Sequence, residues 1–163
     1  MNQSYTRTVN PTVKLIVSLI LTLLVGFGAG FATATSINSW YSTLDKPFFN
    51  PPNWLFAPVW TILYILMGVA FYFVWKLPET TQRNIALFVF VLQLAVNGIW
   101  SLIFFNQHQI GWALVDISIL WVMIIITMYL FTQLSKIAAW LLYPYLLWVS
   151  FATVLNFSIW QLN

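Results

Sequence analysis

The sequence predicts an all-α integral membrane protein built as a bundle of five transmembrane helices, and two observations support this class. Hydrophobic residues make up 61% of the chain and charged residues only 6%, with a mean hydropathy of +0.87. So few polar side chains cannot cover a water-soluble globule of 163 residues. The polar turns also divide the chain into apolar stretches that each approach the roughly 20 residues a helix needs to cross hydrocarbon.

The first transmembrane helix is predicted at about residues 13–35, after a polar N-terminal segment. The uncharged run is too long for the core of a cleaved signal peptide. Small side chains recur at every fourth position, on one helix face: Ser18, Thr22, Gly26, Gly30 and Ala34. Such a face lets another helix approach closely, either within the chain or across a dimer interface, and the pattern does not distinguish the two.

A proline-rich loop is predicted at residues 36–52, because proline lacks the amide donor and restricts the residue before it. Its prolines are Pro47, Pro51 and Pro52. A second helix follows at about 53–76, with Asn53 as its cap and Pro58 tolerated in its first turns. The many Trp and Tyr side chains here are either anchors at the membrane interface or a stiff lid over a pocket for a flat apolar ligand.

Three further helices follow a short charged turn. They are predicted at about 84–105, 109–131 and 136–160. The last is interrupted by Pro144, which neighbouring helices make tolerable by satisfying the freed carbonyl. No soluble domain, long linker or internal repeat remains, so residues 1–163 are expected to form a single membrane domain.

Polar side chains within the spans are costly in hydrocarbon, so each one needs a partner or a function. Gln93, Asn97 and Ser101 recur every fourth residue, and their spacing alone favours hydrogen bonding between helices over a ligand site. Asp116 is the one carboxylate inside a span, and three states stay open for it: protonated, paired with a hydroxyl or indole donor, or reached by water. His108 is expected to be a solvated turn residue rather than a haem ligand.

The residue types disfavour several function classes. Cysteine is absent, which rules out disulfides and thiolate metal sites. No metal-ligand cluster, serine triad or phosphate loop occurs, so no metal site and no conventional hydrolase or kinase is indicated. The net charge of +3 is spread over isolated residues, so no nucleic-acid partner is expected. A channel or purely structural subunit is disfavoured, because the spans lack a ring of charged or carbonyl groups.

The positive charges predict the orientation in the lipid bilayer. Lys46 lies on one side of the membrane, and the other five lie on the N-terminal side: Arg7, Lys14, Lys76, Arg83 and Lys136. By the positive-inside rule, the N-terminus is cytoplasmic and the proline-rich loop lies outside in a bacterial cell membrane.

The segment from Trp40 to Tyr64 carries a family resemblance. It reads W-Y-x-x-L-x-K-P-x-x-x-P-P-x-W-x-F-x-P-V-W-x-x-L-Y and resembles the first loop and second helix of the tryptophan-rich sensory protein family, also called the translocator protein or peripheral-type benzodiazepine receptor family (TspO/MBR). The resemblance continues at Gln93, Asn97, Trp100, Ser101, Phe104 and Phe105, in residues 141–148, and at Phe151, Ala152, Leu155 and Asn156. It covers nearly the whole chain after residue 39.

This resemblance implies a membrane protein, commonly a homodimer, that binds tetrapyrroles such as protoporphyrin IX and haem, and benzodiazepine-type ligands, under the first loop for transport or sensing. No cofactor is required, because the porphyrin or haem is the ligand. Carried over position by position, the ligand-binding residues are Tyr41, Pro51, Trp60, Tyr64, Asn97, Ser101, Trp148 and Ala152.

The resemblance also implies an enzymatic alternative. Some relatives are reported to degrade protoporphyrin in light, and the tryptophans concerned match Trp60 and Trp148, which would be the catalytic residues. Animal relatives carry a cholesterol motif that needs a tyrosine and a basic residue where this chain has Phe157 and Gln161. Specific cholesterol recognition is therefore not expected, and a bacterial source is favoured.

Overall fold

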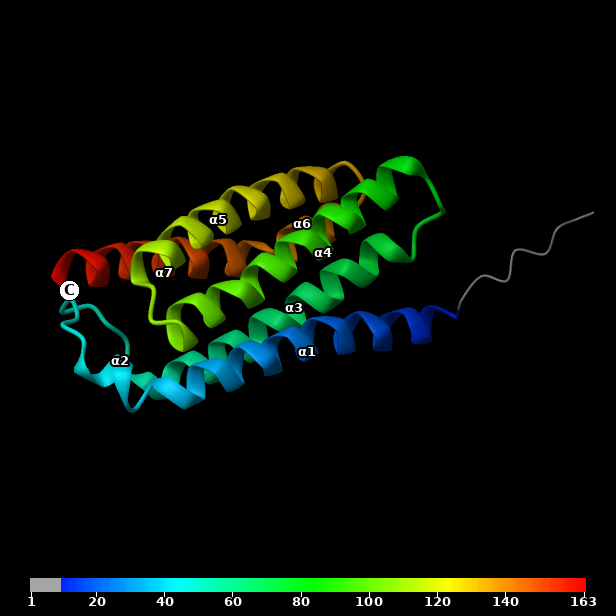
Figure 1. Cartoon of the computed structure of the whole chain (residues 1–163). Coiled ribbons are helices and arrows are strands. Elements are labelled where there is room, and N and C mark those ends of the chain that lie inside the picture. Colours follow the sequence, from blue (N-terminus) through cyan, green and yellow to red (C-terminus); the bar gives the residue numbers. More distant parts are fainter. Residues whose placement is uncertain (1–9) are drawn as a thin grey trace, which may run out of the picture.

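The computed structural model describes residues 10–163, which form a helical bundle without strands in that range. Five segments are long and apolar enough to cross a membrane: Pro11–Ser36, Asn53–Trp75, Thr81–Asn106, Ile110–Thr132 and Lys136–Leu162. They lie alongside one another, and the chain turns back at alternate ends of the bundle (Figure 1). The predicted all-α class with five transmembrane helices is confirmed.

Helix α1 (Pro11–Ser36) packs along α3 (Phe56–Trp75), and its small residues explain how closely the two approach. Ser18 and Thr22 are fully buried. Gly26 faces the ring of Tyr64, where an added Cβ would lie 2.7 Å from Cε2 and 2.9 Å from Cγ. Gly30 has nothing within 4 Å. Internal packing therefore accounts for the first part of the small-residue face, and nothing in residues 10–163 packs on the part at Gly30.

The predicted loop at residues 36–52 contains a short helix, α2 (Trp40–Thr43), and is followed by a single 3-10 turn, η1 (Asn53–Leu55). Asn53 does not cap the second spanning segment as expected. The 3-10 turn already satisfies the amide of Leu55 through the carbonyl of Pro52, at 3.0 Å. The Asn53 side chain instead donates to the carbonyl of Ile37 at 3.4 Å, which ties the start of the loop to its end.

The remaining spans differ from the prediction at their ends. Helix α4 (Thr81–Ser101) begins before residue 84, because Thr80 caps it by accepting from the amide of Arg83 at 3.1 Å. It continues into a π-helical turn, η2 (Leu102–Asn106), and then α5 (Ile110–Thr132). The last span is divided into α6 (Lys136–Leu141) and α7 (Tyr143–Leu162). Pro144 falls in the first turn of α7, where its missing donor costs little.

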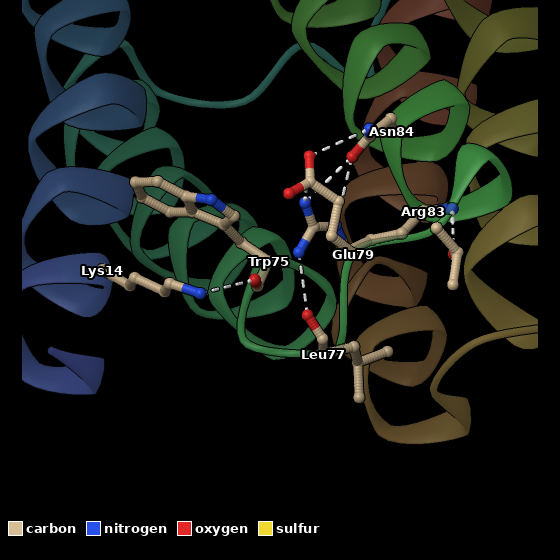
Figure 2. Close-up of polar contacts among 7 residues, drawn as sticks. Lys14, Trp75, Leu77, Glu79, Arg83 and Asn84 are labelled. Atoms are coloured by element: carbon tan, nitrogen blue, oxygen red, sulfur yellow. Dashed lines mark hydrogen bonds and ion pairs between the residues drawn. The ribbon is translucent and has the colours of Figure 1, made fainter. Parts of the chain in front are cut away.

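The end of the bundle away from the loop collects cations around the C-terminus of α3 (Figure 2). Lys14 Nζ donates to the carbonyl of Trp75 at 3.2 Å. Arg83 Nη1 donates to the carbonyl of Leu77 at 2.8 Å, and Nη2 lies 3.5 Å from Oε1 of Glu79. These cations satisfy carbonyls that the helix leaves free and complement its dipole. Arg7, counted in the predicted charge bias, lies outside the described residues.

The buried apolar side chains form two clusters. The larger one fills the bundle between α3, α4, α5, α6 and α7. The smaller one lies at the loop end and consists of Tyr41, Phe104, Phe105, Ala113, Leu155 and Ile159. The C-terminus lies at the same end, beside the loop that follows α2 (Figure 1). The small cluster therefore brings the loop, the π-helical turn and α7 together.

Candidate ligand-binding site

A cavity opens at the loop end, between the small cluster and the first turns of α3. Its walls come from α2, α3, α4, η2 and α7: Tyr41, Phe56, Trp60, Trp100, Phe104, Phe105, Trp148, Ala152, Leu155, Asn156 and Ile159. The cavity measures only about 20 Å³, whereas pockets for drug-sized ligands measure roughly 300–1,000 Å³. The structure is therefore a closed state, and a ligand of that size requires the walls to move apart.

Aromatic rings make up most of the walls and contact one another at their edges and faces. Trp100 stacks on Phe104 with ring centroids 5.3 Å apart. Phe56 meets Trp148 edge-on at 6.2 Å, and Tyr41 lies 5.7 Å from Phe105. Such walls present large, rigid apolar faces that favour stacking with another flat ring system.

The π-helical turn brings two successive phenylalanines to this cavity. The amide of Gln107 donates to the carbonyl of Leu102 at 3.0 Å, five residues back, which widens the helix by one residue. Phe104 and Phe105 are both almost fully buried, 2% and 3% exposed, and both contact the ring of Tyr41. In a regular α-helix, neighbouring side chains point in directions about 100° apart, so the wider turn lets both rings serve one cavity.

Tyr41 connects the cavity to the loop above it. Its hydroxyl donates to Oδ1 of Asn50 at 2.6 Å. Burial raises the pKa of Tyr41 to about 12, although the hydrogen bond with Asn50 acts in the opposite direction. The hydroxyl therefore stays protonated at physiological pH and keeps its role as donor.

Two contacts join the rest of the loop to α7. The backbone amide of Asp45 donates to Oδ1 of Asn163 at 3.1 Å, and Nδ2 of Asn163 donates back to the carbonyl of Asp45 at 3.0 Å. The ring of Phe49 lies edge-on to Phe151, with centroids 6.3 Å apart. Loop residues 44–52, called the cover below, thus contact the wall residue Tyr41 on one side and the C-terminal end of the chain on the other.

A buried polar network lies on the inner side of Trp60. Tyr64 donates to Oδ1 of Asn97, Nδ2 of Asn97 donates to the Tyr145 hydroxyl at 3.1 Å, and that hydroxyl donates to Oε1 of Gln93 at 2.9 Å. Trp60 stacks on Tyr64 with centroids 5.5 Å apart. Interhelical hydrogen bonding therefore accounts for Gln93 and Asn97. The network also holds the Tyr64 ring, on which Trp60 stacks.

Three buried polar atoms have no hydrogen-bond partner within residues 10–163: Trp148 Nε1, Asp116 Oδ2 and Gln93 Nε2. Leaving such an atom unpaired costs about 1–3 kcal/mol. Trp148 belongs to the cavity wall, so one of these unpaired donors is on a residue that lines the cavity. For Asp116, the structure shows no hydroxyl or indole donor on Oδ2, which leaves the protonated and the hydrated states open.

The structure brings four of the eight predicted ligand-binding residues together in the cavity wall: Tyr41, Trp60, Trp148 and Ala152. The other four lie around it. Pro51 belongs to the cover, Tyr64 and Asn97 belong to the polar network, and Ser101 is buried on α4.

The prediction missed several wall residues. Leu155 and Ile159 follow Trp148 and Ala152 at the three-to-four residue spacing of one helix face, a signal that would have found them. Trp100, Phe104 and Asn156 also share faces with predicted residues. Phe56 lies four residues before Trp60 and Phe105 lies four residues after Ser101, so both also follow the helical spacing of predicted residues.

His108 lies in the turn between η2 and α5, and it is exposed. Its φ is 56°, a left-handed conformation that is uncommon for a residue other than glycine. The ring stacks on Trp40 with centroids 4.2 Å apart, and Nε2 lies 3.5 Å from Oγ of Ser36. His108 therefore holds α1, α2 and the η2–α5 turn together at the loop end.

The fold and the site define a class: multi-pass membrane proteins with an aromatic cavity closed by a proline-rich loop. The model of the TspO/MBR family matches residues 18–161. The chain belongs to this family.

Named relatives agree with this assignment. The tryptophan-rich protein TspO of Archaeoglobus fulgidus is 42% identical over 150 residues, which cover 92% of this chain and 97% of the relative. The protein of the same name from Chlorobaculum tepidum is 48% identical over 147 residues, 88% of this chain and 91% of the relative. The human translocator protein is 44% identical over 126 residues, 76% and 75% of the two chains.

Proposed function

We propose that this protein binds tetrapyrroles such as protoporphyrin IX and haem, and similar flat apolar ligands, in the aromatic cavity, for transport or sensing. The observation that carries the proposal is the cavity wall itself, in which seven of the eleven lining residues are aromatic. The macrocycle of a porphyrin is flat and apolar, so it offers these rings the stacking surface they favour.

The proposed ligand contacts extend from the wall into the cover and the network. Trp60, Trp148 and Ala152 form the wall, and Tyr41 and Pro51 act with the cover. The unpartnered indole N–H of Trp148 supplies a hydrogen bond to a polar ligand atom. Tyr64, Asn97 and Ser101 act below the wall, where the network holds Trp60 in place.

The names of the relatives support two roles for binding. One relative of 38% identity, from Cereibacter sphaeroides, is called a tryptophan-rich sensory protein, and the human relative is called a translocator protein. Binding with a movable cover serves either role, because sensing needs a closed complex and translocation needs the cover to release the ligand.

The proposal is tested by titrating the purified protein with protoporphyrin IX in the dark and following the quenching of tryptophan fluorescence. Ala152→Phe should fill the cavity and weaken binding at least ten-fold. The matched control is Val154→Phe on the same helix, because Val154 is 56% exposed on the outer surface and should tolerate the ring. Equal affinity of both variants and the parent would place the ligand elsewhere.

A second candidate function is light-dependent degradation of the bound porphyrin. Trp60 and Trp148 both line the cavity, so two indoles lie where the pigment would be excited. The pigment itself supplies the excited state, which requires no acid–base residues from the protein.

This second candidate is tested at saturating porphyrin. Trp60→Phe and Trp148→Phe keep most of the apolar contact, so binding should fall only modestly, by on the order of 1 kcal/mol. If the indoles take part chemically, bleaching under illumination collapses in these variants and persists in Trp75→Phe. Trp75 is the last residue of α3, whereas the cavity is lined by the first turns of that helix. Equal bleaching in all variants at full occupancy would contradict the enzymatic function.

A further inference from the structure

We propose that Lys46 selects ligands that carry a carboxylate, by holding that carboxylate at the rim of the cavity. The inference rests on the proposed function and adds to it the charge of the ligand. It also gives a role to a residue that is outside the cavity wall and outside the set of expected ligand-binding residues.

Lys46 is the one Lys or Arg at the loop end of the bundle. Every other Lys or Arg among residues 10–163 lies at the opposite end, at Lys14, Lys76, Arg83 and Lys136. Two of those four already bind backbone carbonyls at the end of α3. An anionic ligand that approaches the cavity from the loop end therefore meets a single fixed cation.

The ammonium group of Lys46 lies directly over a residue of the cavity wall. Nζ is 5.0 Å from the centroid of the Tyr41 ring, a cation–π distance. The rings of Phe104 and Phe105 lie 6.0 and 5.7 Å from the same ring. Lys46 itself is not a wall residue, so its cation lies next to the wall at Tyr41 and outside the aromatic interior.

Lys46 has donor capacity that no carboxylate uses. Nζ donates to the carbonyls of Leu44 at 2.9 Å and Ser42 at 3.3 Å, which occupies two of its three N–H groups. In the part of the chain that the structure describes, the one ion pair joins Arg83 to Glu79, at the far end. Among residues 10–163, no carboxylate therefore lies within ion-pair distance of Lys46. A ligand carboxylate would form a charge-assisted bond stronger than those to the carbonyls.

The position of Lys46 within the cover also holds it close to the C-terminal end of α7. The preceding residue, Asp45, is attached to Asn163 through its backbone on both sides, so the chain at Lys46 is held next to α7. The occupant that fits this arrangement has a flat apolar body for the aromatic cavity and an anionic edge for the rim. A tetrapyrrole with free propionates meets both requirements, and the same macrocycle with esterified carboxylates meets only the first.

The experiment compares protoporphyrin IX with its dimethyl ester in a neutral maltoside detergent, using quenching of tryptophan fluorescence in the dark. The parent, Lys46→Gln and Lys46→Arg are measured, with Lys76→Gln as the control for losing one positive charge at the other end. The quantity of interest is the affinity ratio of acid to ester within each protein, because differences in how the two pigments enter detergent micelles cancel between variants.

We expect Lys46→Gln to lower affinity for the acid about two- to five-fold, the range for an exposed ion pair, and to leave the ester unchanged. Lys46→Arg and Lys76→Gln should keep the ratio of the parent, because both retain a cation at position 46. Added salt should lower the ratio in the parent and in these two variants toward the value of Lys46→Gln, whose own ratio should not change. Equal loss for acid and ester in Lys46→Gln would show that Lys46 merely packs on Tyr41, and an unchanged ratio would also overturn the inference. If neither pigment quenches the parent, the proposed function itself fails.

Discussion

Replacing Gly26 by alanine should destabilise the bundle, because Gly26 is where α1 touches the ring of Tyr64. The added Cβ would lie 2.7 Å from Cε2 and 2.9 Å from Cγ of that ring. Both distances are far below ordinary van der Waals contact, and Cγ cannot move without the rest of the side chain. The ring is also held from two other directions, by stacking on Trp60 and by the hydrogen bond to Asn97. Relief therefore requires α1 to move away or the polar network to break.

The expected cost follows from these constraints. Overpacking of a filled interior costs about 1–3 kcal/mol, and the better helix propensity of alanine returns about 0.5–1 kcal/mol of that. For a chain of this size, each 1 kcal/mol shifts the midpoint of thermal unfolding by about 2–4 °C. Gly26→Ala should thus lower the Tm by several degrees, measured in detergent through circular dichroism at a fixed heating rate.

Gly30→Ala is the matched control, since it makes the same change one turn further along α1, where nothing lies within 4 Å. Its Tm should be unchanged or slightly higher. The double variant Gly26→Ala with Tyr64→Ala should show less than the sum of the two single effects, because removing the ring removes the clash. If Gly26→Ala and Gly30→Ala have the same Tm, the close contact between Gly26 and Tyr64 is not a constraint on packing.

Three further predictions concern the loop and the orientation of the chain. Pro51→Ala combined with Pro52→Ala should weaken porphyrin binding more than it lowers the Tm, because a more flexible cover loses more entropy on closing; unchanged affinity would make the loop a simple connector. Tyr41→Phe removes the hydroxyl that holds Asn50 and should speed ligand dissociation in stopped-flow experiments, whereas an unchanged rate would exclude this bond as a restraint on the cover. Reporter fusions after Asn163 and within residues 77–82 should lie on opposite sides of the membrane, and the same side for both would contradict the odd number of spans.

The spanning helices could be predicted because hydrocarbon imposes a single dominant requirement, a run of apolar residues of fixed length. Their ends were harder to predict, because they depend on individual hydrogen bonds. Thr80 moves the start of α4 to Thr81, and a 3-10 turn replaces the expected cap at Asn53. Such local choices differ by about 1 kcal/mol, which a hydropathy pattern does not resolve.

The candidate site was predictable where side chains follow a regular helix and unpredictable where the backbone departs from one. Trp60, Trp148 and Ala152 keep the helical spacing and line the cavity as expected. Phe105 lies four residues after the predicted Ser101, but it belongs to the π-helical turn, whose extra residue no regular spacing predicts. Whether a helix accommodates that residue depends on packing against α1 and the loop, which is a tertiary effect and leaves no local pattern in the sequence.

The closed cavity and the two kinds of hydrogen bond around it indicate which wall moves. On the inner side, Tyr64, Asn97 and Tyr145 exchange hydrogen bonds in the membrane interior, where an unpaired group costs about 1–3 kcal/mol and no water replaces the lost partner. On the outer side, the paired bonds between Asp45 and Asn163 are exposed, so water can take their place at little net cost. Under the proposed function, a ligand that needs more than about 20 Å³ would therefore gain its space by lifting the cover, while the Tyr64 ring under Trp60 would stay fixed. This difference in cost predicts that a ligand would enter and leave at the loop end.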